Sequence, residues 1–218
     1  GVDVRLLDRR DYLFRFVDDE INESHLYHMR DERVTFYLGT DFTQIKQDAN
    51  GKVITTLENG RDIKTDMLMF CSGRNGATGS LNLDVANVKL GSRGIIPVND
   101  ELQTNVSHIY AAGDVIGFPA LASTAMERGR RAACNALGHP FDVDADLMPY
   151  GIFTIPEISV IGKTEQQLSE EGVPYEIGIG RFREVSRGTI VGDKSGLLKL
   201  VFNQDRKSTR LNSSHKPN

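Results

Sequence analysis

The sequence predicts a mixed α/β fold, because strand patterns and helix patterns alternate along most of its length. Residues 1–74 read as strand, helix, strand, two hairpin turns and a further strand. Residues 108–137 read as a strand and then a helix, and beyond Pro149 the order is again strand, helix, strand. Parallel strands need crossover helices, so this alternation favours a partly parallel sheet with helices packed against it.

Composition places the chain among ordinary globular proteins and excludes several functional classes. The chain has 218 residues, 39% of them hydrophobic and 26% charged, and a net charge of −4. An acidic balance does not suit nucleic acids or anionic membranes, and no apolar run reaches the roughly 20 residues that span a bilayer. Cys71 and Cys134 form neither a disulfide framework nor a CxxC pair. We therefore expect a cytoplasmic protein without nucleic-acid or membrane partners.

The N-terminal part begins with a strand and a capped helix. Residues 2–8 are rich in Val and Leu and are expected to form a buried strand. Asp18 is expected to cap the following helix, which should end near Arg30. Asp19 and Glu20 fall in its first turn, where the helix dipole favours acidic side chains.

A second strand and a hairpin insertion follow. Residues 34–39 predict a strand, and the Asn-Gly pairs at 50–51 and 59–60 predict tight hairpin turns, because Asn-Gly supplies positive φ angles. Residues 65–74 predict another strand, which ends at a glycine. This order is that of the second half of a Rossmann-like nucleotide-binding domain.

The C-terminal half predicts one long helix and then a smaller α+β segment. A strand over 108–114 leads to a helix over 121–137 that Gly138 closes. Thr164 and Gln167 form a capping-box pattern for a later helix. Further strands joined by glycine-containing turns are expected over 187–203, whereas the polar, aperiodic residues 207–218 are expected to form a disordered or artefactual tail.

Three features are expected to have structural roles only. His25 and His28 share a helix face without a third ligand, so solvated histidines are favoured over a metal site. Cys71 is expected to be a packed thiol on a strand. The charges of residues 127–131 are expected to form a solvated helix face.

Asp8, Arg9 and Arg10 form the first candidate binding site. An acid at the end of the second strand of a dinucleotide-binding unit accepts hydrogen bonds from the adenosine ribose, and a nearby arginine accommodates a 2′-phosphate. The two arginines beside Asp8 suggest tolerance of both NAD and NADP. The alternative is a charged surface turn, because the glycine-rich half of the fingerprint is absent from the sequence.

A second candidate site centres on Asp114. Gly113 follows two alanines, so a flat ligand could approach the backbone, and Asp114 offers an acceptor to a polyol hydroxyl. The next helix begins near Leu121 and directs its free N–H groups toward whatever lies there. Gly73 and Arg74 also follow an apolar stretch, where a glycine would let the backbone approach a ligand closely, although a plain turn is the favoured explanation of that pair taken alone. Local capping by Asp114 is the weaker alternative, because the helix begins too far along the chain.

Three stretches resemble the pyridine nucleotide–disulfide oxidoreductase family. "TNVSHIYAAGD" (104–114) resembles its flavin motif, "DMLMFCSGR" (66–74) resembles the strand before its Gly-Arg pair, and "GIFTIPEISVIGKTEQQL" (151–168) resembles the start of its dimerisation domain. The chain departs from the family at "GRNGAT" (73–78), where most members have Gly-Arg-x-Pro-Asn. That departure, together with residues 113–133, resembles the transhydrogenase branch of the family.

The resemblance implies a glutathione-reductase-like flavoprotein fold and a division of the chain into domains. Residues 1–72 would be the end of an NAD(P)-binding domain, 73–147 the end of an FAD-binding domain, and 148–206 the start of a dimerisation domain through which a homo-oligomer would form. The chain would then be an internal fragment.

The resemblance also implies cofactors and their binding residues. Asp114, next to Gly113, would bind the FAD ribityl chain, and Leu121, Ala122 and Ser123 would present backbone amides to the flavin. Gly73 would lie near the pyridine nucleotide, with Asp8, Arg9 and Arg10 near its adenosine ribose, and Arg74 is also expected to bind a cofactor.

The implied activity is FAD-dependent hydride transfer between NADPH and NAD⁺, with no catalytic side chain assigned within this chain. The alternatives are a disulfide oxidoreductase similar to dihydrolipoamide dehydrogenase, and a truncated fragment that is not catalytic.

Overall fold

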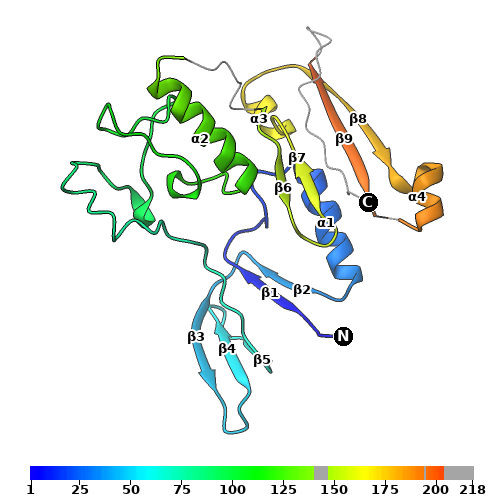
Figure 1. The fold of residues 1–218 in the computed structure, drawn as a ribbon. Coiled ribbons are helices and arrows are strands. Elements are labelled where there is room, and N and C mark those ends of the chain that lie inside the picture. Colours follow the sequence, from blue (N-terminus) through cyan, green and yellow to red (C-terminus); the bar gives the residue numbers. More distant parts are fainter. Residues whose placement is uncertain (140–146, 194, 204–218) are drawn as a thin grey trace. The chain divides into compact units, whose positions relative to one another are not determined.

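The computed structural model describes residues 1–139, 147–193 and 195–203, which fall into two compact units (Figure 1). One unit combines Gly1–Phe70 with the described residues from Gly151 onward, and the other is Cys71–Tyr150. The mixture of strands and helices confirms the predicted α/β class. Among the described residues, no helix combines the length and the apolar character that a membrane crossing needs.

A parallel β-α-β arrangement opens the first unit. β1 (Arg5–Asp8) pairs in parallel with β2 (Thr35–Leu38), and α1 (Asp19–Asp31) connects them. The Asp18 carboxylate accepts a hydrogen bond from the Glu20 amide at 3.2 Å, so the predicted N-cap is confirmed. The register pairs Asp8 with Leu38, which places Asp8 at the carboxyl end of its strand.

A three-stranded antiparallel meander follows. β3 (Phe42–Gln47), β4 (Val53–Leu57) and β5 (Asp62–Thr65) pair in sequence order. Gly51 and Gly60 both have φ of +79° in the two turns, which confirms the Asn-Gly hairpin predictions.

The strand predicted over 65–74 is wrong. Only Thr65 lies in a strand, and Met67 and Met69 are 83% and 87% exposed. A β-strand needs a neighbour that accepts and donates backbone hydrogen bonds, and no described residue pairs with this segment. Cys71 is therefore exposed, and its predicted packing is also wrong.

The described C-terminal residues form two hairpin-like pairs of strands and two short helices. The predicted capping box is present, because Gln167 N donates to Thr164 Oγ1 and Thr164 N donates to Gln167 Oε1. The elements are β6 (Tyr150–Ile152), β7 (Ile158–Val160), α3 (Glu165–Glu170), β8 (Tyr175–Arg181), α4 (Ser186–Val191) and β9 (Leu197–Asn203).

The helix α4 replaces the first of the strands predicted over 187–203. Gly188 makes this possible, because a Cβ at that position would lie only 1.8 Å from the Phe182 carbonyl oxygen. The helix ends at Gly192, which has a left-handed φ of +74°. Close backbone approach at one glycine therefore overrides the local β-branched composition.

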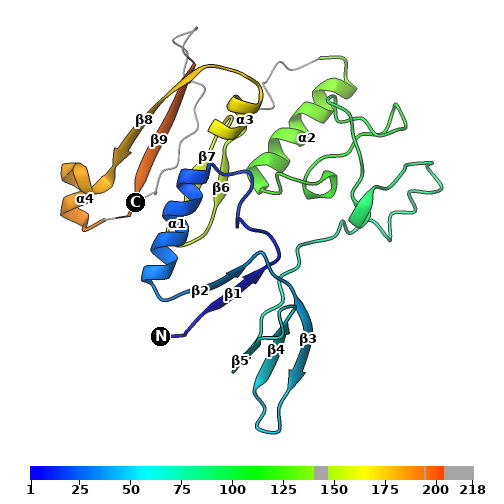
Figure 2. The ribbon, with the colours of Figure 1, turned by 180° about the vertical axis from the view of Figure 1, so that it is seen from behind.

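A buried ion cluster joins α1, α3 and β9, which lie far apart in the sequence. The ribbons of these three elements are labelled in Figure 2. The Lys199 side chain is 2% exposed, and its Nζ lies 2.7 Å from Asp18 Oδ1 and 3.1 Å from Glu20 Oε2. Lys199 also pairs with Glu165, whose backbone N–H donates to Asp18 Oδ2. One ammonium thus satisfies three carboxylates at the N-terminal ends of two helices.

The second unit is built around α2 (Ala122–Ala136) and the loops before it. The helix matches the predicted 121–137 closely, and Gly138 follows it with φ of +71°. Two short 3₁₀ turns precede it: η1 (Ser92–Gly94) and η2 (Asp114–Ile116).

The strand predicted over 108–114 is wrong, because the described residues pair there only through one bridge between Gln103 and Tyr110. The run Ala111-Ala112-Gly113 has weak β propensity, and Gly113 leaves the extended region.

Candidate functional site

The Asp114 carboxylate lies where the extended chain turns into η2. Gly113 has φ of +83°, a conformation that side-chain-bearing residues rarely adopt, so the chain can turn sharply at this point. Asp114 Oδ2 accepts a hydrogen bond from Arg74 Nη1 at 3.0 Å. Arg74 and Asp114, each predicted separately to bind a cofactor, are therefore in contact, and both side chains are accessible to solvent.

The N-terminus of α2 offers free backbone donors. Leu121 occupies the N-cap position in an extended conformation and makes no side-chain capping hydrogen bond. Ala122 and Ser123 in the first turn are exposed and small. A ligand acceptor could therefore reach these amides without displacing a side chain, and the helix dipole would favour a partly negative group.

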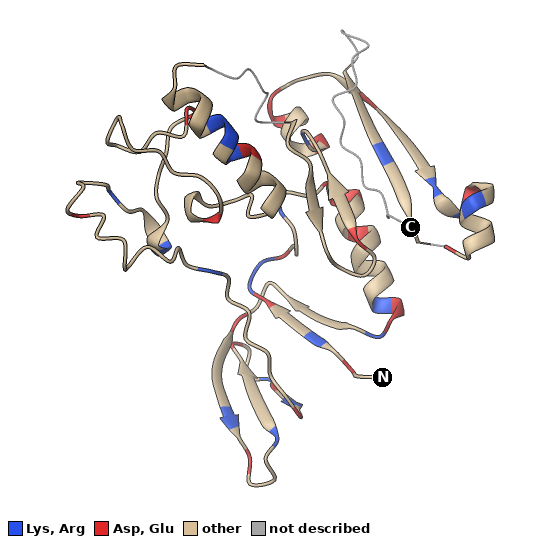
Figure 3. Cartoon of the chain, in the orientation of Figure 1, with Lys and Arg blue, Asp and Glu red and all other residues tan. Residues whose placement is uncertain are grey.

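The loop between η2 and α2 is held by an arginine from the helix itself. Arg128 Nη1 donates to the carbonyl oxygens of Gly117 and Pro119, and Nη2 donates to that of Phe118, each at 2.9 Å. The prediction that residues 127–131 form only a solvated face is therefore wrong at this position. Figure 3 marks both basic and acidic residues along the ribbon of α2.

Gly73 belongs to the same unit and lies in a segment that is neither helix nor strand. Its φ is +93°, and a Cβ there would approach Arg93 Nη1 to 3.2 Å. Nearby, a Cβ at Gly76 would lie 2.2 Å from the Gly94 carbonyl oxygen, so these two backbone segments are in direct contact. Gly76 and Gly94 therefore allow close backbone packing, whereas the contact at Gly73 is with a side chain and its role stays a prediction.

The predicted nucleotide residues Asp8, Arg9 and Arg10 lie in the first unit, at the end of β1. Asp8 Oδ1 accepts from Arg10 Nε at 2.9 Å, and Oδ2 accepts from Arg10 Nη2 at 2.6 Å. The side-chain hydrogen bonds from Arg10 hold the pKa of Asp8 below its ordinary value. Asp8 is therefore ionised at neutral pH and already has a basic partner, while Arg9 is exposed.

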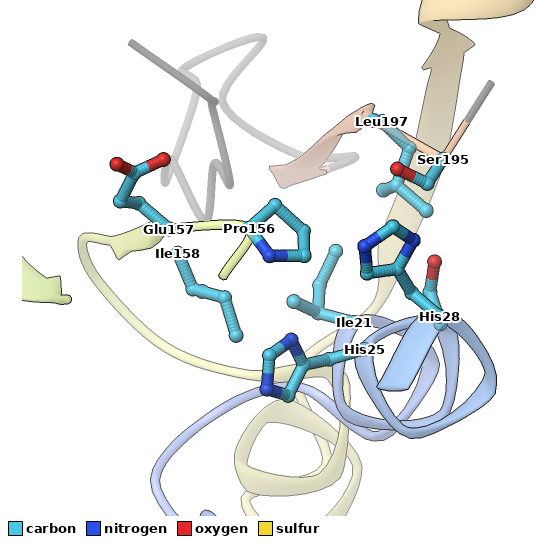
Figure 4. A pocket seen from close by; sticks show the side chains of 10 residues that line it. Ile21, His25, His28, Pro156, Glu157, Ile158, Ser195 and Leu197 are labelled. Atoms are coloured by element: carbon cyan, nitrogen blue, oxygen red, sulfur yellow. The ribbon is translucent and has the colours of Figure 1, made fainter. Parts of the chain in front are cut away.

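A separate small hollow lies between α1 and the two C-terminal strand pairs (Figure 4). His25 and His28 face it from α1, opposite Pro156, Ile158 and Leu197. Its volume of about 40 Å³ is enough for a few water molecules only. His25 is 3% exposed, so the prediction that it is solvated is wrong. Among the described residues no group of three metal-ligating side chains occurs.

The residue that sequence reasoning missed is Arg128. Its signal was weak, because nothing in the local pattern distinguishes it from Arg130, which pairs with Glu127 on the same helix. Its contacts with the loop are seen only in the structure, where residues 117–119 turn back toward the second turn of α2.

Comparison with known proteins matches two family models. The model described as "Pyridine nucleotide-disulphide oxidoreductase" matches residues 1–129, and the model of that family's dimerisation domain matches residues 148–211. Among curated relatives, the soluble pyridine nucleotide transhydrogenases of Mycobacterium tuberculosis and of a Marinomonas species are 45% and 42% identical over 205 residues. The aligned region is 94% of this chain and 44% of each relative, so the chain spans less than half of their length.

Two solved structures have folds similar to that of this chain. LpdA from Mycobacterium tuberculosis is 22% identical with a TM-score of 0.88, over 100% of this chain and 47% of that protein. The flavoprotein disulfide reductase RclA from Escherichia coli is 26% identical with a TM-score of 0.85, over 99% and 49% respectively. These similarities confirm the predicted glutathione-reductase-like fold class.

Proposed function

Because this chain belongs to the pyridine nucleotide-disulphide oxidoreductase family, we propose that the protein carrying it is a flavoprotein that transfers hydride between NADPH and NAD⁺. The relatives named soluble pyridine nucleotide transhydrogenase support this choice within the family. The observation that carries the proposal is the accessible Asp114 carboxylate, placed just before an uncapped helix N-terminus.

The residues around Asp114 fit an extended polyol joined to a flat ring. Asp114 would accept a hydrogen bond from a ribityl hydroxyl, and the amides of Ala122 and Ser123 would donate to the electron-rich edge of the ring. FAD bound there would supply the redox chemistry, accepting hydride from one nucleotide and returning it to the other. The chain would bind, orient and polarise the flavin, and we assign no catalytic side chain to the chain.

The pyridine nucleotides would be recognised at the end of β1. Arg9, which is exposed, would pair with the 2′-phosphate of NADPH, and Asp8 would bind the ribose hydroxyls of NAD⁺ after Arg10 moves aside. Gly73 and Arg74 would lie near the nucleotide, and the C-terminal domain would form a homo-oligomer. We also propose that the protein acts in the cytoplasm.

The test is to purify a full-length protein carrying this sequence and to record its visible spectrum after desalting. We expect bound flavin and NADPH-dependent reduction of an NAD⁺ analogue with a distinct absorbance. Asp114→Ala should lose most of the bound flavin, because the ribityl hydroxyl would lose its charged acceptor. A colourless wild-type protein would contradict the proposal.

A disulfide oxidoreductase is the second candidate, favoured by the similarity to RclA. The same purified protein separates the two: NADPH-dependent reduction of a small disulfide, without transfer to the NAD⁺ analogue, would favour the second. Such an enzyme needs a pair of cysteines that can form a disulfide. Cys71 and Cys134 lie far apart in the sequence, and both are free thiols.

A further inference from the structure

The flavin site proposed above depends on two elements that are separated by a short irregular loop. η2 carries the Asp114 carboxylate, and α2 carries the free amides. The loop between them, residues 117–121, contains Gly117 at φ of +94° and belongs to no helix or strand. For one ligand to contact both elements, this loop must hold them at a fixed separation.

Arg128 is the side chain that holds the loop. Its guanidinium donates to the carbonyls of Gly117, Phe118 and Pro119, three consecutive residues, at 2.9 Å each. A guanidinium is planar and carries five N–H donors in a fixed fork, so several acceptors bound by it are fixed relative to one another. Because Arg128 lies in the second turn of α2, these hydrogen bonds connect the loop to the helix that follows it in the sequence.

Further contacts connect the loop held by Arg128 to Asp114. Gly117 N donates back to the Asp114 carbonyl at 3.0 Å, so the first residue held by Arg128 also closes η2. A Cβ built on Gly113 would lie 3.6 Å from Ala125 Cβ. The turn before Asp114 therefore lies against the first turn of α2. Burial lowers the pKa of Arg128, and the charge of Asp114 acts in the opposite direction.

We propose that Arg128 is a positioning residue for the flavin, which sets the distance and direction between Asp114 and the N-terminus of α2. This inference rests on the proposed function. Arg128 would act through the loop, because its guanidinium donates to the loop carbonyls.

The test compares two substitutions of Arg128 in a full-length protein carrying this sequence. Arg128→Lys keeps the charge but replaces the fork by a single donor group, and Arg128→Gln removes the charge but keeps two N–H donors. The matched control is Arg131→Lys on the same helix, whose side chain reaches the Asp100 carbonyl and not the loop. Each apoprotein is titrated with FAD, and the flavin dissociation constant is obtained from the fluorescence change.

We expect Arg128→Lys to raise the flavin dissociation constant about tenfold, as the loss of a multidentate contact predicts. The KM for NADPH at saturating flavin and the urea midpoint of the apoprotein should match those of the Arg131→Lys control. A purely structural role would instead lower the urea midpoint and leave the flavin affinity of the folded fraction unchanged.

The outcomes separate this inference from the proposed function. If the wild-type protein binds FAD and both Arg128 variants bind it equally well, the positioning role is overturned while the flavoprotein proposal stands. If the wild-type protein binds no FAD, both are overturned. If either Arg128 variant does not fold, the decision rests on the variant that does, and failure of both variants to fold would overturn a role confined to positioning.

Discussion

The carboxylate at the end of β1 and its two neighbouring arginines make a charged group that could distinguish NADPH from NADH. Arg10 holds Asp8 through two side-chain hydrogen bonds, and Arg9 remains exposed beside it. A 2′-phosphate arriving there would meet two guanidinium groups, whereas an unmodified ribose would need the Asp8 oxygens themselves. Both modes use the same three residues in different pairings.

Replacing Arg9 and Arg10 together by alanine should therefore weaken NADPH use selectively. Charge-assisted hydrogen bonds contribute about 1.5–3 kcal/mol, so kcat/KM for NADPH should fall about tenfold to a hundredfold. The value for NADH should change less, because Asp8 gains freedom to bind the ribose. The measurement is steady-state kinetics with each nucleotide. Arg5→Ala on the same strand, where Arg5 donates to the Lys64 carbonyl, serves as the control, and equal losses with both nucleotides would contradict the assignment.

At the scale of secondary-structure elements, the ion cluster joins helices α1 and α3 to strand β9. Although burial lowers it, hydrogen bonds to Asp18 and Glu165 raise the pKa of Lys199 above its ordinary value. A raised pKa means that the stabilisation is fully present below the ordinary lysine value of about 10.4 and is lost only above it. Lys199 therefore stays charged across the neutral range and contributes no pH dependence there.

Lys199→Met should strongly destabilise the fold, because it leaves three carboxylates facing one another with one of them fully buried. Breaking a buried ion pair by removing one partner costs about 3–5 kcal/mol. The free energy of unfolding in urea checks this. Lys163→Met is the matched control, since its pair with Glu171 is more exposed and should contribute less than about 1 kcal/mol. Similar losses for the two variants would show that burial of the cluster is not decisive.

Helix α1 also carries a group that should make the fold sensitive to acid. Burial, with a smaller effect of His28, lowers the pKa of His25, and among the described residues neither ring nitrogen has a hydrogen-bond partner. The unfolded chain therefore binds a proton more readily than the folded one, and stability falls as the pH drops below the ordinary histidine value of about 6.5. The slope from one such proton cannot exceed about 1.4 kcal/mol per pH unit.

His25→Leu should remove this part of the pH dependence at little cost in stability at neutral pH, because no hydrogen bond is lost. Unfolding free energies at about pH 7.5 and about pH 5.5 measure it. His108→Leu, at an exposed position, should keep the wild-type slope. An unchanged slope in His25→Leu would mean that the acid sensitivity arises at other groups.

The sequence predicted those elements whose causes are local, and failed where the cause lies elsewhere in the chain. The Asp18 cap, the Asn-Gly turns and the Thr164 capping box depend on a few adjacent residues, and all are present. The strands predicted over 65–74 and 108–114 depend on pairing partners elsewhere in the chain, and the described residues provide only one bridge, between Gln103 and Tyr110. The Arg128 contacts depend on how a glycine- and proline-containing loop turns, which no periodicity encodes. The roles of Asp8, Gly73, Asp114 and the α2 N-terminus remain predictions.

At the scale of the whole molecule, the chain carries a surface that the described residues leave uncovered. Met67, Met69 and Phe70 are 83%, 87% and 65% exposed in one continuous segment, which we call the Met67–Phe70 segment. Neighbouring large apolar side chains of this kind are uncommon on the surface of a soluble protein and mark a site that another surface covers. The chain spans 44% of its curated relatives, so the region of those relatives outside the alignment is available to provide that surface.

We therefore expect the 218-residue chain alone to bind a hydrophobic dye and to hold no FAD after desalting. A full-length protein carrying the chain should bind less dye and keep its flavin, because the Met67–Phe70 segment would be covered. Dye fluorescence and the visible spectrum of the two proteins, prepared in parallel, measure the difference.

The double change Met67→Lys and Met69→Lys should lower dye binding by the isolated chain, where it removes apolar surface, and should destabilise the full-length protein by burying charge. Exposed Val85→Lys is the control and should do neither. An isolated chain that stays yellow and ignores the dye would show that this segment needs no cover and that the flavin site is complete within the chain.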